Sequence, residues 1–494
     1  MFGMDWLMRM QNEDGSVLSV MGLSHASPPS SATGQSLYGP ANTIATRRTA
    51  AAFALGATVF RRSGLSQLEN YADTLHNRAL LAWQWAETYP DSIFHNNRDQ
   101  NNSRGLAAGN QEVDDTERLA AKLEAAVYLF ELTGDTQFRA LFDENYKQLP
   151  LFLWNNVVDQ YRFRHQSMYK YYAALPDATP AVRDEIRSSL TAGYNRNGNY
   201  IERLVSQADP YRAFIDHYNW GSNAYKSTYG ISFWQLNKYS LAQTEEVDFL
   251  QAAESYLHYI HGVNPLGMVY LSNMGEYGAG KSVTQFFHAW FSNGSPKWDE
   301  VGVSEYGPAP GFLTGGPNKF YDWDGCCPSD CDSPVNNARC FEESIQPPRN
   351  QPPQKSYKDF NTSWPLNSWE VTENSCGYQS DYIRLLSKFV SNQGFSSVIP
   401  GSSERVSFGL ESVKKITVRN NVLEFSLPAN VRAGKPVQVD IFSLSGKLLN
   451  TVQIDSAPGK NRVDLPSENL SSGTILVRLR MDGNTVFRNM VYLK

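Results

Sequence analysis

The sequence predicts a large, mainly α-helical domain followed by a small β-sandwich. Apolar residues recur at helical spacing up to about residue 262, whereas residues 416–494 alternate apolar and polar side chains between turn signals. All 11 Trp residues lie at or before Trp369, so the two parts also differ in composition. A chain of 494 residues is long enough for one large domain plus an appendage.

The overall composition excludes several classes of protein. With 41% hydrophobic and 19% charged residues, the chain is unlike a disordered protein. A net charge of −6 differs from the basic balance of nucleic-acid binders, so we expect no nucleic-acid partner. No apolar run reaches the ~18 residues of a membrane-spanning helix. Residues 1–11 read as an amphipathic helix, and Asp5 and Arg9 interrupt any secretory signal there.

Further helices are expected wherever the 3.6-residue period recurs. The expected ranges are 43–62, 65–88, 115–132, 137–146, 180–190, 223–237, 245–261 and 377–391. Helices that follow one another through short or irregular loops, with few alternating strands between them, indicate an all-α array. Glu112, Asp114 and Asp115 are expected at one helix start, where N-capping explains Asp114 or Asp115 and a cleft contact stays open. Asp216 and His217 are expected at another helix start.

Residues 263–369 are rich in Gly, Pro, Asn and Tyr and read as long loops, which are usually functional. All five cysteines lie here or just beyond: Cys326, Cys327, Cys331, Cys340 and Cys376. We favour disulfides over a zinc site because the spacing lacks facing C-x-x-C pairs and a loop with little core gains most from cross-links. The odd count leaves at least one thiol unpaired, and the pairing is left open.

Four aspartates accompany these cysteines and keep a structural calcium ion open as an option, although no EF-hand spacing supports it: Asp322, Asp324, Asp330 and Asp332.

Several segments of the helical part occur in a recognisable order. They are the helix Met4–Gln11, the WGSN turn at 220–223, the NPLG turn at 264–267, the GGPN loop at 315–318 and the acidic segment 368–378. Together they resemble glycoside hydrolase family 9, inverting β-1,4-glucanases built on an (α/α)6 barrel. The resemblance covers residues 1–391. It implies an (α/α)6 barrel that lacks its first helix, because Met4–Gln11 resembles the family's second barrel helix.

The resemblance also implies site residues. Glu373 matches the family's general acid, and Tyr378 matches a tyrosine beside it in the cleft. The family usually has Asn where this sequence has Thr372, which bears on the orientation of the acid. Inverting hydrolysis needs two carboxyl groups, one of them protonated to donate to the leaving oxygen. The alternative for Glu373 is a carboxylate that merely stabilises the N-terminus of a helix.

Four further residues are candidates for substrate binding. His288 lies where the family has a substrate-contacting His, although Ala289 follows it instead of the usual Arg. Trp290, Trp298 and Tyr306 are candidates for stacking on sugar rings, with plain packing as the alternative. The expected site contains no metal, and the expected chemistry requires no cofactor.

The family's general base is an Asp in a DAGD-type motif, and no DAGD occurs in this sequence. We therefore expect an N-terminally shortened form that is weakly active or inactive, with its base upstream of Met1.

The C-terminal part has a resemblance of its own. Segments 439–448, 458–461 and 470–479 resemble the C-terminal sorting domain of the type IX secretion system of bacteria. The alternative is a generic accessory β-sandwich. The expected organisation is a catalytic domain over 1–393, a linker over 394–415 and the β-sandwich over 416–494. The resemblance implies a secreted or cell-surface bacterial protein that engages the secretion machinery.

The expected function is hydrolysis of β-1,4-glucosidic bonds in cellulose or related β-glucans by an endoglucanase, expected to be a monomer. Two alternatives stay open. One is a surface protein that binds glycans without cleaving them, and the other is an (α/α)6 hydrolase of another polysaccharide, such as xylan or chitosan.

Overall fold

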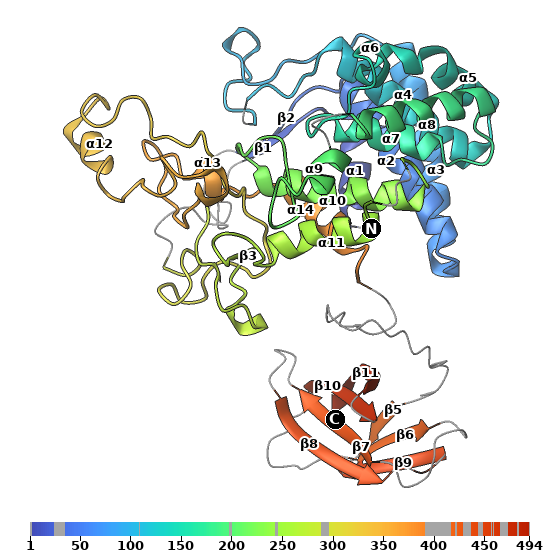
Figure 1. Ribbon diagram of the computed structural model, residues 1–494. Helices are drawn as coiled ribbons and strands as arrows, with labels where there is room; N and C mark the ends of the chain where they lie inside the picture. Colours follow the sequence, from blue (N-terminus) through green and yellow to red (C-terminus); the bar gives the residue numbers. More distant parts are fainter. Residues whose placement is uncertain are drawn as a thin grey trace. The chain divides into compact units, whose positions relative to one another are not determined.

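A computed structural model describes most of the chain (Figure 1). The described residues are 2–23, 35–107, 109–196, 200–242, 246–287, 296–390, 416–419, 422–427, 436–442, 448–455, 457, 459–464, 473–481 and 484–493. They form two compact units, one from residues 1–272 and 283–385 and the other from 273–282 and 386–494. His288 and Trp290 lie outside the described residues.

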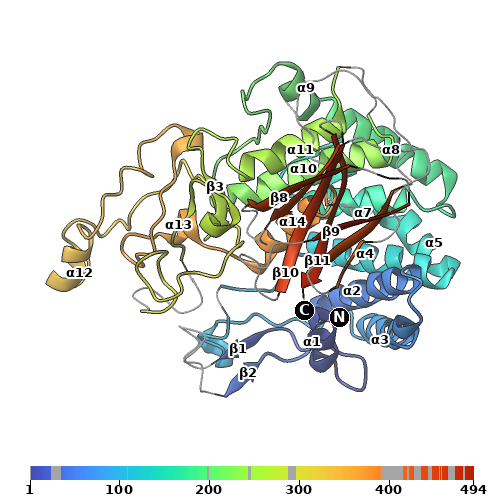
Figure 2. The same ribbon diagram turned by 90° about the horizontal axis from the view of Figure 1, so that it is seen from below.

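Helices dominate the first unit (Figure 2). They are α1 (Phe2–Met10), α2 (Thr43–Arg62), α3 (Glu69–Thr88), α4 (Asp115–Thr133), α5 (Thr136–Asn145), α6 (Pro150–Leu153), α7 (Phe163–Tyr172), α8 (Pro180–Tyr194), α9 (Tyr200–Val205), α10 (Ser222–Lys238), α11 (Phe249–Ile260), α12 (Pro334–Arg339), α13 (Trp369–Thr372) and α14 (Cys376–Leu386). None of the described helices is long and apolar enough to cross a membrane.

Neighbouring helices pair in antiparallel hairpins. At one end of the α2–α3 pair, Arg61 Nη2 lies 2.8 Å from the Asp73 carboxylate. At the other end, the Thr43 hydroxyl donates to the Tyr89 carbonyl at 2.6 Å. Both helices place alanines on their facing sides, among them Ala50 and Ala54 of α2 and Ala72, Ala79 and Ala82 of α3, all of them buried. These small side chains let the two backbones approach closely, which favours the hairpin.

The first member of each hairpin runs parallel to the first member of the next. Asn42, the N-cap of α2, donates its amide to Glu112 just before α4 at 3.3 Å. His165 Nε2 in the first turn of α7 lies 2.9 Å from the Glu117 carboxylate in the first turn of α4. The N-terminal ends of α2, α4 and α7 therefore lie at the same end of the unit.

The same end holds the starts of α10 and α14. Asn219, ahead of α10, donates to the hydroxyl of Tyr161, ahead of α7, at 3.2 Å. A Cβ added to Gly221 would lie 2.7 Å from the hydroxyl oxygen of Tyr378 in α14, so these two helix starts also touch. We call α2, α4, α7, α10 and α14 the parallel set. Their N-terminal ends form one face of the unit, which we call the N-terminal face.

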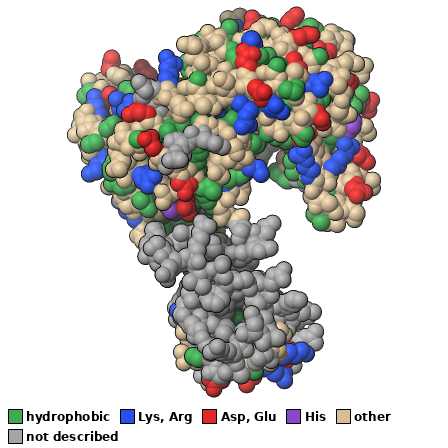
Figure 3. Space-filling view, turned by 45° about the vertical axis from the view of Figure 1, so that its right-hand side comes forward, with side chains coloured by type: hydrophobic (Ala, Val, Ile, Leu, Met, Phe, Trp, Pro, Cys, Tyr) green, Lys and Arg blue, Asp and Glu red, His purple; other side chains and the backbone are tan. Residues whose placement is uncertain are grey.

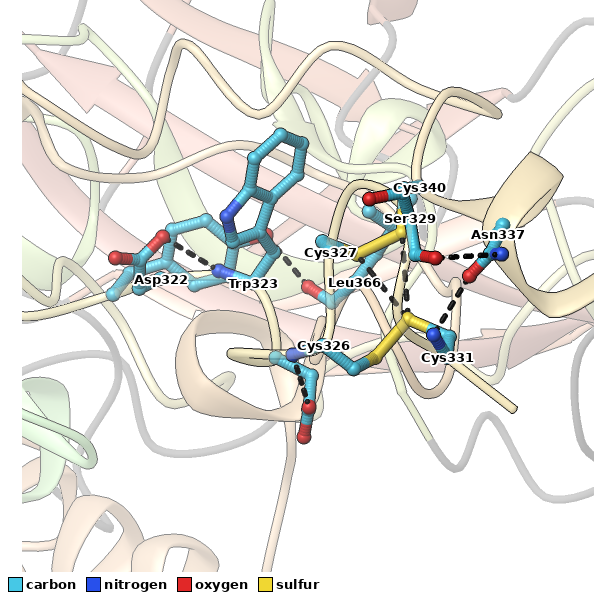
Figure 4. The surroundings of a disulfide bond; sticks show 11 residues. Asp322, Trp323, Cys326, Cys327, Ser329, Cys331, Asn337, Cys340 and Leu366 are labelled. Carbon is cyan, nitrogen blue, oxygen red and sulfur yellow. Dashed lines mark hydrogen bonds between the residues drawn. A yellow bond between two sulfur atoms is a disulfide. The ribbon is translucent and has the colours of Figure 1, made fainter. Parts of the chain in front are cut away.

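The cysteine-bearing loop is cross-linked by two disulfides, Cys326–Cys331 and Cys327–Cys340 (Figure 4). Cys376 is free and exposed. The preference for disulfides over zinc is confirmed, and one thiol remains unpaired as the odd count required. The Asn337 side chain accepts the Cys331 amide at 2.7 Å and donates to the Ser329 carbonyl at 3.0 Å, which ties α12 to the loop.

The described strands before residue 416 are all short, and one of them, β4, spans the boundary between the two units. They are β1 (Met21–Leu23), β2 (Ser36–Tyr38), β3 (Val269–Ser272) and β4 (Ser282–Val283). The pair β1–β2 is antiparallel.

The second unit contains two antiparallel sheets. Their strands are β5 (Ile416–Arg419), β6 (Val422–Leu427), β7 (Pro436–Phe442), β8 (Leu448–Asp455), β9 (Gly459–Asp464), β10 (Gly473–Met481) and β11 (Asn484–Leu493). The sheet orders are β11-β10-β7-β8 and β5-β6-β9. Both sheets bury alternate apolar residues, such as Val439 and Leu479 in one and Leu423 and Val463 in the other. This pattern is typical of a β-sandwich.

Candidate active site

The acidic segment lies at the N-terminal face of the first unit. Helix α13 ends at Thr372, Glu373 follows it with an extended backbone (φ −59°, ψ 140°), and α14 begins three residues further on at Cys376. The Ser375 hydroxyl accepts the Tyr378 amide at 3.1 Å and so caps α14. The half-buried Glu373 lies two residues before this cap.

Three motif segments come together around Glu373. The Asn223 amide of the WGSN turn donates to the Gly315 carbonyl of the GGPN loop at 2.9 Å. The Gly316 amide donates to the Val371 carbonyl at 2.8 Å, which joins the same loop to the acidic segment. Gly316 has a φ of +96°, and a Cβ there would lie 2.5 Å from the Asn223 side chain. Only glycine meets both demands, so the local sequence fixes this junction.

Thr372 holds the backbone of the acidic segment through hydrogen bonds from its buried side chain. Its side chain is fully buried, and its hydroxyl lies 2.9 Å from the carbonyls of Phe360 and Ser368. The same hydroxyl accepts the Phe287 amide at 3.2 Å. The residue that departs from the family pattern therefore holds the backbone next to Glu373 in place.

Tyr378 lies close to Glu373, as expected from the resemblance. Burial of the phenol raises the pKa of Tyr378, and the neighbouring Glu373 carboxylate raises it further. The phenol is therefore neutral at ordinary pH and can only donate or accept a hydrogen bond there.

The acidic segment contains a second carboxyl group, that of Glu370, which the sequence analysis did not identify as a candidate. Burial raises the pKa of Glu370 to about 7, with a smaller contribution from the negative charge of Asp322. A carboxyl group with such a pKa is partly protonated at neutral pH, which is the property that a general acid needs. The raised pKa of Glu370 results from its burial, which cannot be predicted from the sequence pattern.

The predicted aromatic candidates are only partly described. The rings of Trp298 and Tyr306 lie 4.7 Å apart at a 35° tilt, and Tyr306 is 56% exposed. Trp298 is half-buried, so only the Tyr306 ring offers an exposed surface on which a sugar ring could stack.

Exposed aromatic rings also lie at the N-terminal face, where sequence reasoning missed them. Trp220 of the WGSN turn is 42% exposed, and Tyr161 is 53% exposed. The Tyr161 ring packs edge-on against Tyr225 with centroids 5.5 Å apart. Tyr161 lies in an irregular loop with no periodic pattern, so only its neighbours in space reveal it.

Lys226 is another residue that the sequence analysis did not identify. Its side chain is fully buried, and its ammonium group donates to the Tyr218 hydroxyl at 2.5 Å and to the Ala213 carbonyl. The nitrogen lies 3.8 Å from an Asp209 carboxylate oxygen and 3.8 Å from the centre of the Tyr259 ring. Burial lowers the pKa of Lys226 to about 7, against the opposing effect of Asp209.

The residues expected at helix starts have structural partners. Asp114 caps α4 by accepting the Glu117 amide at 2.9 Å. Asp216 and His217 lie in the loop ahead of α10, which begins only at Ser222, so the expected helix start there is wrong. Asp216 instead accepts a hydrogen bond from the buried Tyr229 hydroxyl. The structural interpretation of both acids is thus supported.

The helices of the first unit form hairpins, and the first helices of these hairpins make up the parallel set. The N-terminal face of the parallel set carries a carboxyl group among tyrosines. This arrangement defines a protein of the α/α-barrel class. The sequence model described as Glycosyl hydrolase family 9 matches residues 1–386. The chain therefore belongs to glycosyl hydrolase family 9.

Relatives and solved structures agree with this membership. A curated relative, a cellodextrinase of Butyrivibrio fibrisolvens, is 25% identical over 330 residues, which cover 64% of this chain and 54% of the relative. A single-mutant thermostable endoglucanase of Alicyclobacillus acidocaldarius matches with a TM-score of 0.57 and 17% identity, over 78% of this chain and 63% of that one. A metagenome-derived family 9 endoglucanase matches with a TM-score of 0.54 and 19% identity, over 78% of this chain and 60% of that one.

These structural matches confirm the predicted fold class, a mainly α-helical (α/α)6 barrel fold followed by small C-terminal sheets. The chain spans about half the length of the curated relative that it matches.

Proposed function

We propose that this chain hydrolyses β-1,4-glucosidic bonds of cellulose or related β-glucans with inversion at the anomeric carbon. The observation that carries the proposal is the junction of the WGSN, GGPN and acidic segments around Glu373 at the N-terminal face. Membership of family 9 and the similarity to a cellodextrinase and an endoglucanase support the choice of substrate.

Glu373 is the proposed general acid. Its carboxyl group donates a proton to the glycosidic oxygen as the bond to the anomeric carbon breaks, and the leaving sugar departs as an alcohol. The neutral Tyr378 phenol beside it can orient this group by a hydrogen bond. Water attacks from the opposite face of the ring, so inverting enzymes hold the second carboxylate about 6.5–9.5 Å away.

The water-activating carboxylate is proposed to belong to a DAGD-type segment, which the 494 residues do not contain. On this proposal the 494 residues by themselves hydrolyse glucan weakly. A glycan-binding protein without catalysis is the second candidate, because the exposed rings of Trp220 and Tyr161 at the N-terminal face suit binding without cleavage.

Hydrolysis of cellotetraose separates these candidates. We expect release of shorter oligosaccharides whose first-formed reducing end is the α-anomer by proton NMR, both from this chain and, faster, from a form extended by a DAGD-bearing segment. Binding without any product from either form would favour the non-catalytic candidate. Product from xylan or chitosan alone would reassign the substrate.

We also propose that the C-terminal β-sandwich directs export through type IX secretion and places the protein outside a bacterial cell. The test removes residues 394–494 from the chain expressed in a bacterium with this system. The full chain is expected at the cell surface or in the medium, and the shortened chain inside the cell. An unchanged location would leave only a generic accessory domain.

No cofactor enters the proposed chemistry, and the monomeric state and a structural calcium ion remain proposals. Sedimentation and a thermal melt with and without calcium test them.

A further inference from the structure

Four cysteine sulfurs lie close together in the cross-linked loop (Figure 4). The Sγ atom of Cys331 lies 3.7 Å from that of Cys340 and 4.0 Å from that of Cys327, although neither residue is its disulfide partner. The Sγ atoms of Cys326, Cys327 and Cys331 all lie within 4.8 Å of one another. The two disulfides therefore pack against each other, and their sulfurs form a single group, which we call the sulfur cluster.

The spacing of these sulfurs matches that of ligands around one metal ion. Zn²⁺ binds four thiolates tetrahedrally at about 2.3 Å, which places neighbouring sulfurs about 3.8 Å apart. The contacts of Cys331 with Cys327 and with Cys340, which join one disulfide to the other, are close to this length. Reduction breaks the two S–S bonds and lets the bonded sulfurs separate to the same spacing.

Hydrogen bonds that do not involve sulfur hold the backbone around the sulfur cluster. The Asn337 side chain accepts the Cys331 amide at 2.7 Å. The Asp324 side chain accepts the Cys326 amide at 3.0 Å, and the Asp324 carbonyl accepts the Cys327 amide at 2.9 Å. These contacts do not require the S–S bonds, so we expect the reduced loop to keep its thiols close together.

The surroundings of the sulfurs favour zinc over calcium as the ion bound by this cluster. Cys331 is fully buried and Cys340 is only 1% exposed, so an ion between them is largely shielded from water. Thiolates are soft ligands that select zinc and other thiophilic metals, whereas calcium takes oxygen ligands. Tetrahedral coordination by four cysteines is typical of structural zinc sites.

We propose that the reduced chain binds one Zn²⁺ ion through the four thiolates of the sulfur cluster, those of Cys326, Cys327, Cys331 and Cys340. Each S–S bond takes up two electrons and two protons from a dithiol, which is itself oxidised to a disulfide, and zinc then displaces the four thiol protons. Zinc and the two disulfides are thus alternative cross-links of one loop, the first suited to a reducing compartment and the second to an oxidising one. The zinc site does not depend on the proposed hydrolysis.

Zinc titration of the full-length chain tests the proposal. In a Cys376→Ser background, which removes the free, exposed thiol, the protein is reduced with dithiothreitol, desalted without oxygen and titrated with Zn²⁺ against a chromogenic chelator. We expect about one tightly bound zinc per reduced chain and none for the oxidised chain. Cys331→Ser or Cys340→Ser should weaken binding by at least about 100-fold, because the loss of an outer-shell partner alone costs about 10–100-fold.

An asparagine pair in α12 distinguishes a built site from four loose thiols. Asn337→Ala retains every thiol but removes the hydrogen bond to the Cys331 amide, so it should weaken zinc binding by about tenfold. Asn336→Ala, which changes the neighbouring residue of the same helix, should leave the affinity unchanged. Co²⁺ in place of zinc should give the visible absorption bands of a tetrahedral thiolate site.

Several results would overturn the zinc site. They are no zinc on the reduced, folded chain, equal binding by the oxidised chain, and unchanged affinity in Cys331→Ser and Cys340→Ser or in Asn337→Ala. Circular dichroism follows the fold of the reduced chain. A reduced chain that unfolds and does not regain its structure when zinc is added would also contradict the proposal.

Discussion

Glu370 and Glu373 lie three residues apart in the sequence, but their side chains are in different local environments. Glu373 follows the last turn of α13 in an extended conformation, whereas Glu370 lies within the helix, where burial raises its pKa to about 7. Family resemblance identifies Glu373, and electrostatics alone would favour Glu370. The two residues therefore form a matched pair for mutagenesis.

The raised pKa of Glu370 has a consequence for stability. The folded state holds the proton more tightly than the unfolded state, so stability falls as pH rises from about 4.5 to 7. Glu370→Gln removes this penalty, and we expect its melting temperature relative to the parent to rise by about 1–2 °C between pH 4.5 and 7.5. A difference in melting temperature that does not change with pH would contradict this account.

Lys226 links α10 to the loop that leads into the WGSN turn, because it contacts Ala213 and Tyr218. Removing one partner of a buried ion pair typically costs about 3–5 kcal/mol. We therefore expect Lys226→Met to lower the free energy of unfolding by about 3 kcal/mol in a urea titration. The double variant with Asp209→Asn should recover part of this loss, and strictly additive losses would contradict the pairing.

Burial also gives Lys226 a pH dependence of the opposite sign to that of Glu370. Its folded-state pKa of about 7 lies below its unfolded value near 10.5, so stability rises with pH between these values. The Lys226→Met protein should lack this component of the rise between pH 7 and 10.

At the scale of single elements, sequence periodicity located most of the long helices. The expected range 43–62 equals that of α2, and 115–132 differs from α4 by one residue. Helix α7 was not expected. It buries the polar side chains of His165, Gln166 and Lys170, so it lacks the apolar stripe on which periodicity depends.

Two neighbouring aspartates, Asp114 and Asp115, lie at the start of α4, and either could cap the helix by its sequence position. Asp114 accepts the Glu117 amide, whereas the Asp115 side chain is fully exposed. We expect Asp114→Ala to cost about 1 kcal/mol of unfolding free energy and Asp115→Ala less than about 0.5 kcal/mol. Equal losses, measured by urea titration, would show that the helix cap is assigned to the wrong residue.

The disulfide pairing was beyond sequence reasoning, because four cysteines within fifteen residues allow three pairings. We expect alkylation of the unfolded, unreduced protein to modify one thiol, at Cys376, as read by peptide mass spectrometry. Modification of Cys326 or Cys340 would contradict the pairing.

At the scale of the whole molecule, the motifs predicted the family and the fold class, but not the residues that complete the site. The junction around Glu373 depends on contacts between segments far apart in the sequence, such as Asn223 with Gly315 and Gly316 with Val371, which no local pattern records. Over the face drawn in Figure 3, acidic and basic side chains are interspersed on the described surface, in keeping with the modest net charge.

The central claim is that Glu373 is the general acid of glucan hydrolysis. A general acid matters most when the leaving group is poor, since 2,4-dinitrophenolate departs without a proton. The decisive measurement compares kcat/KM on cellotetraose and on 2,4-dinitrophenyl β-cellobioside for Glu373→Gln and Glu370→Gln, in the form extended by the DAGD-bearing segment.

For Glu373→Gln we predict a loss of about 10²–10⁴-fold on cellotetraose and a loss of less than about tenfold on the dinitrophenyl substrate. Glu370→Gln should change neither value by more than a few-fold. An equal loss on both substrates in Glu373→Gln, or a selective loss on cellotetraose in Glu370→Gln, would contradict the assignment of Glu373.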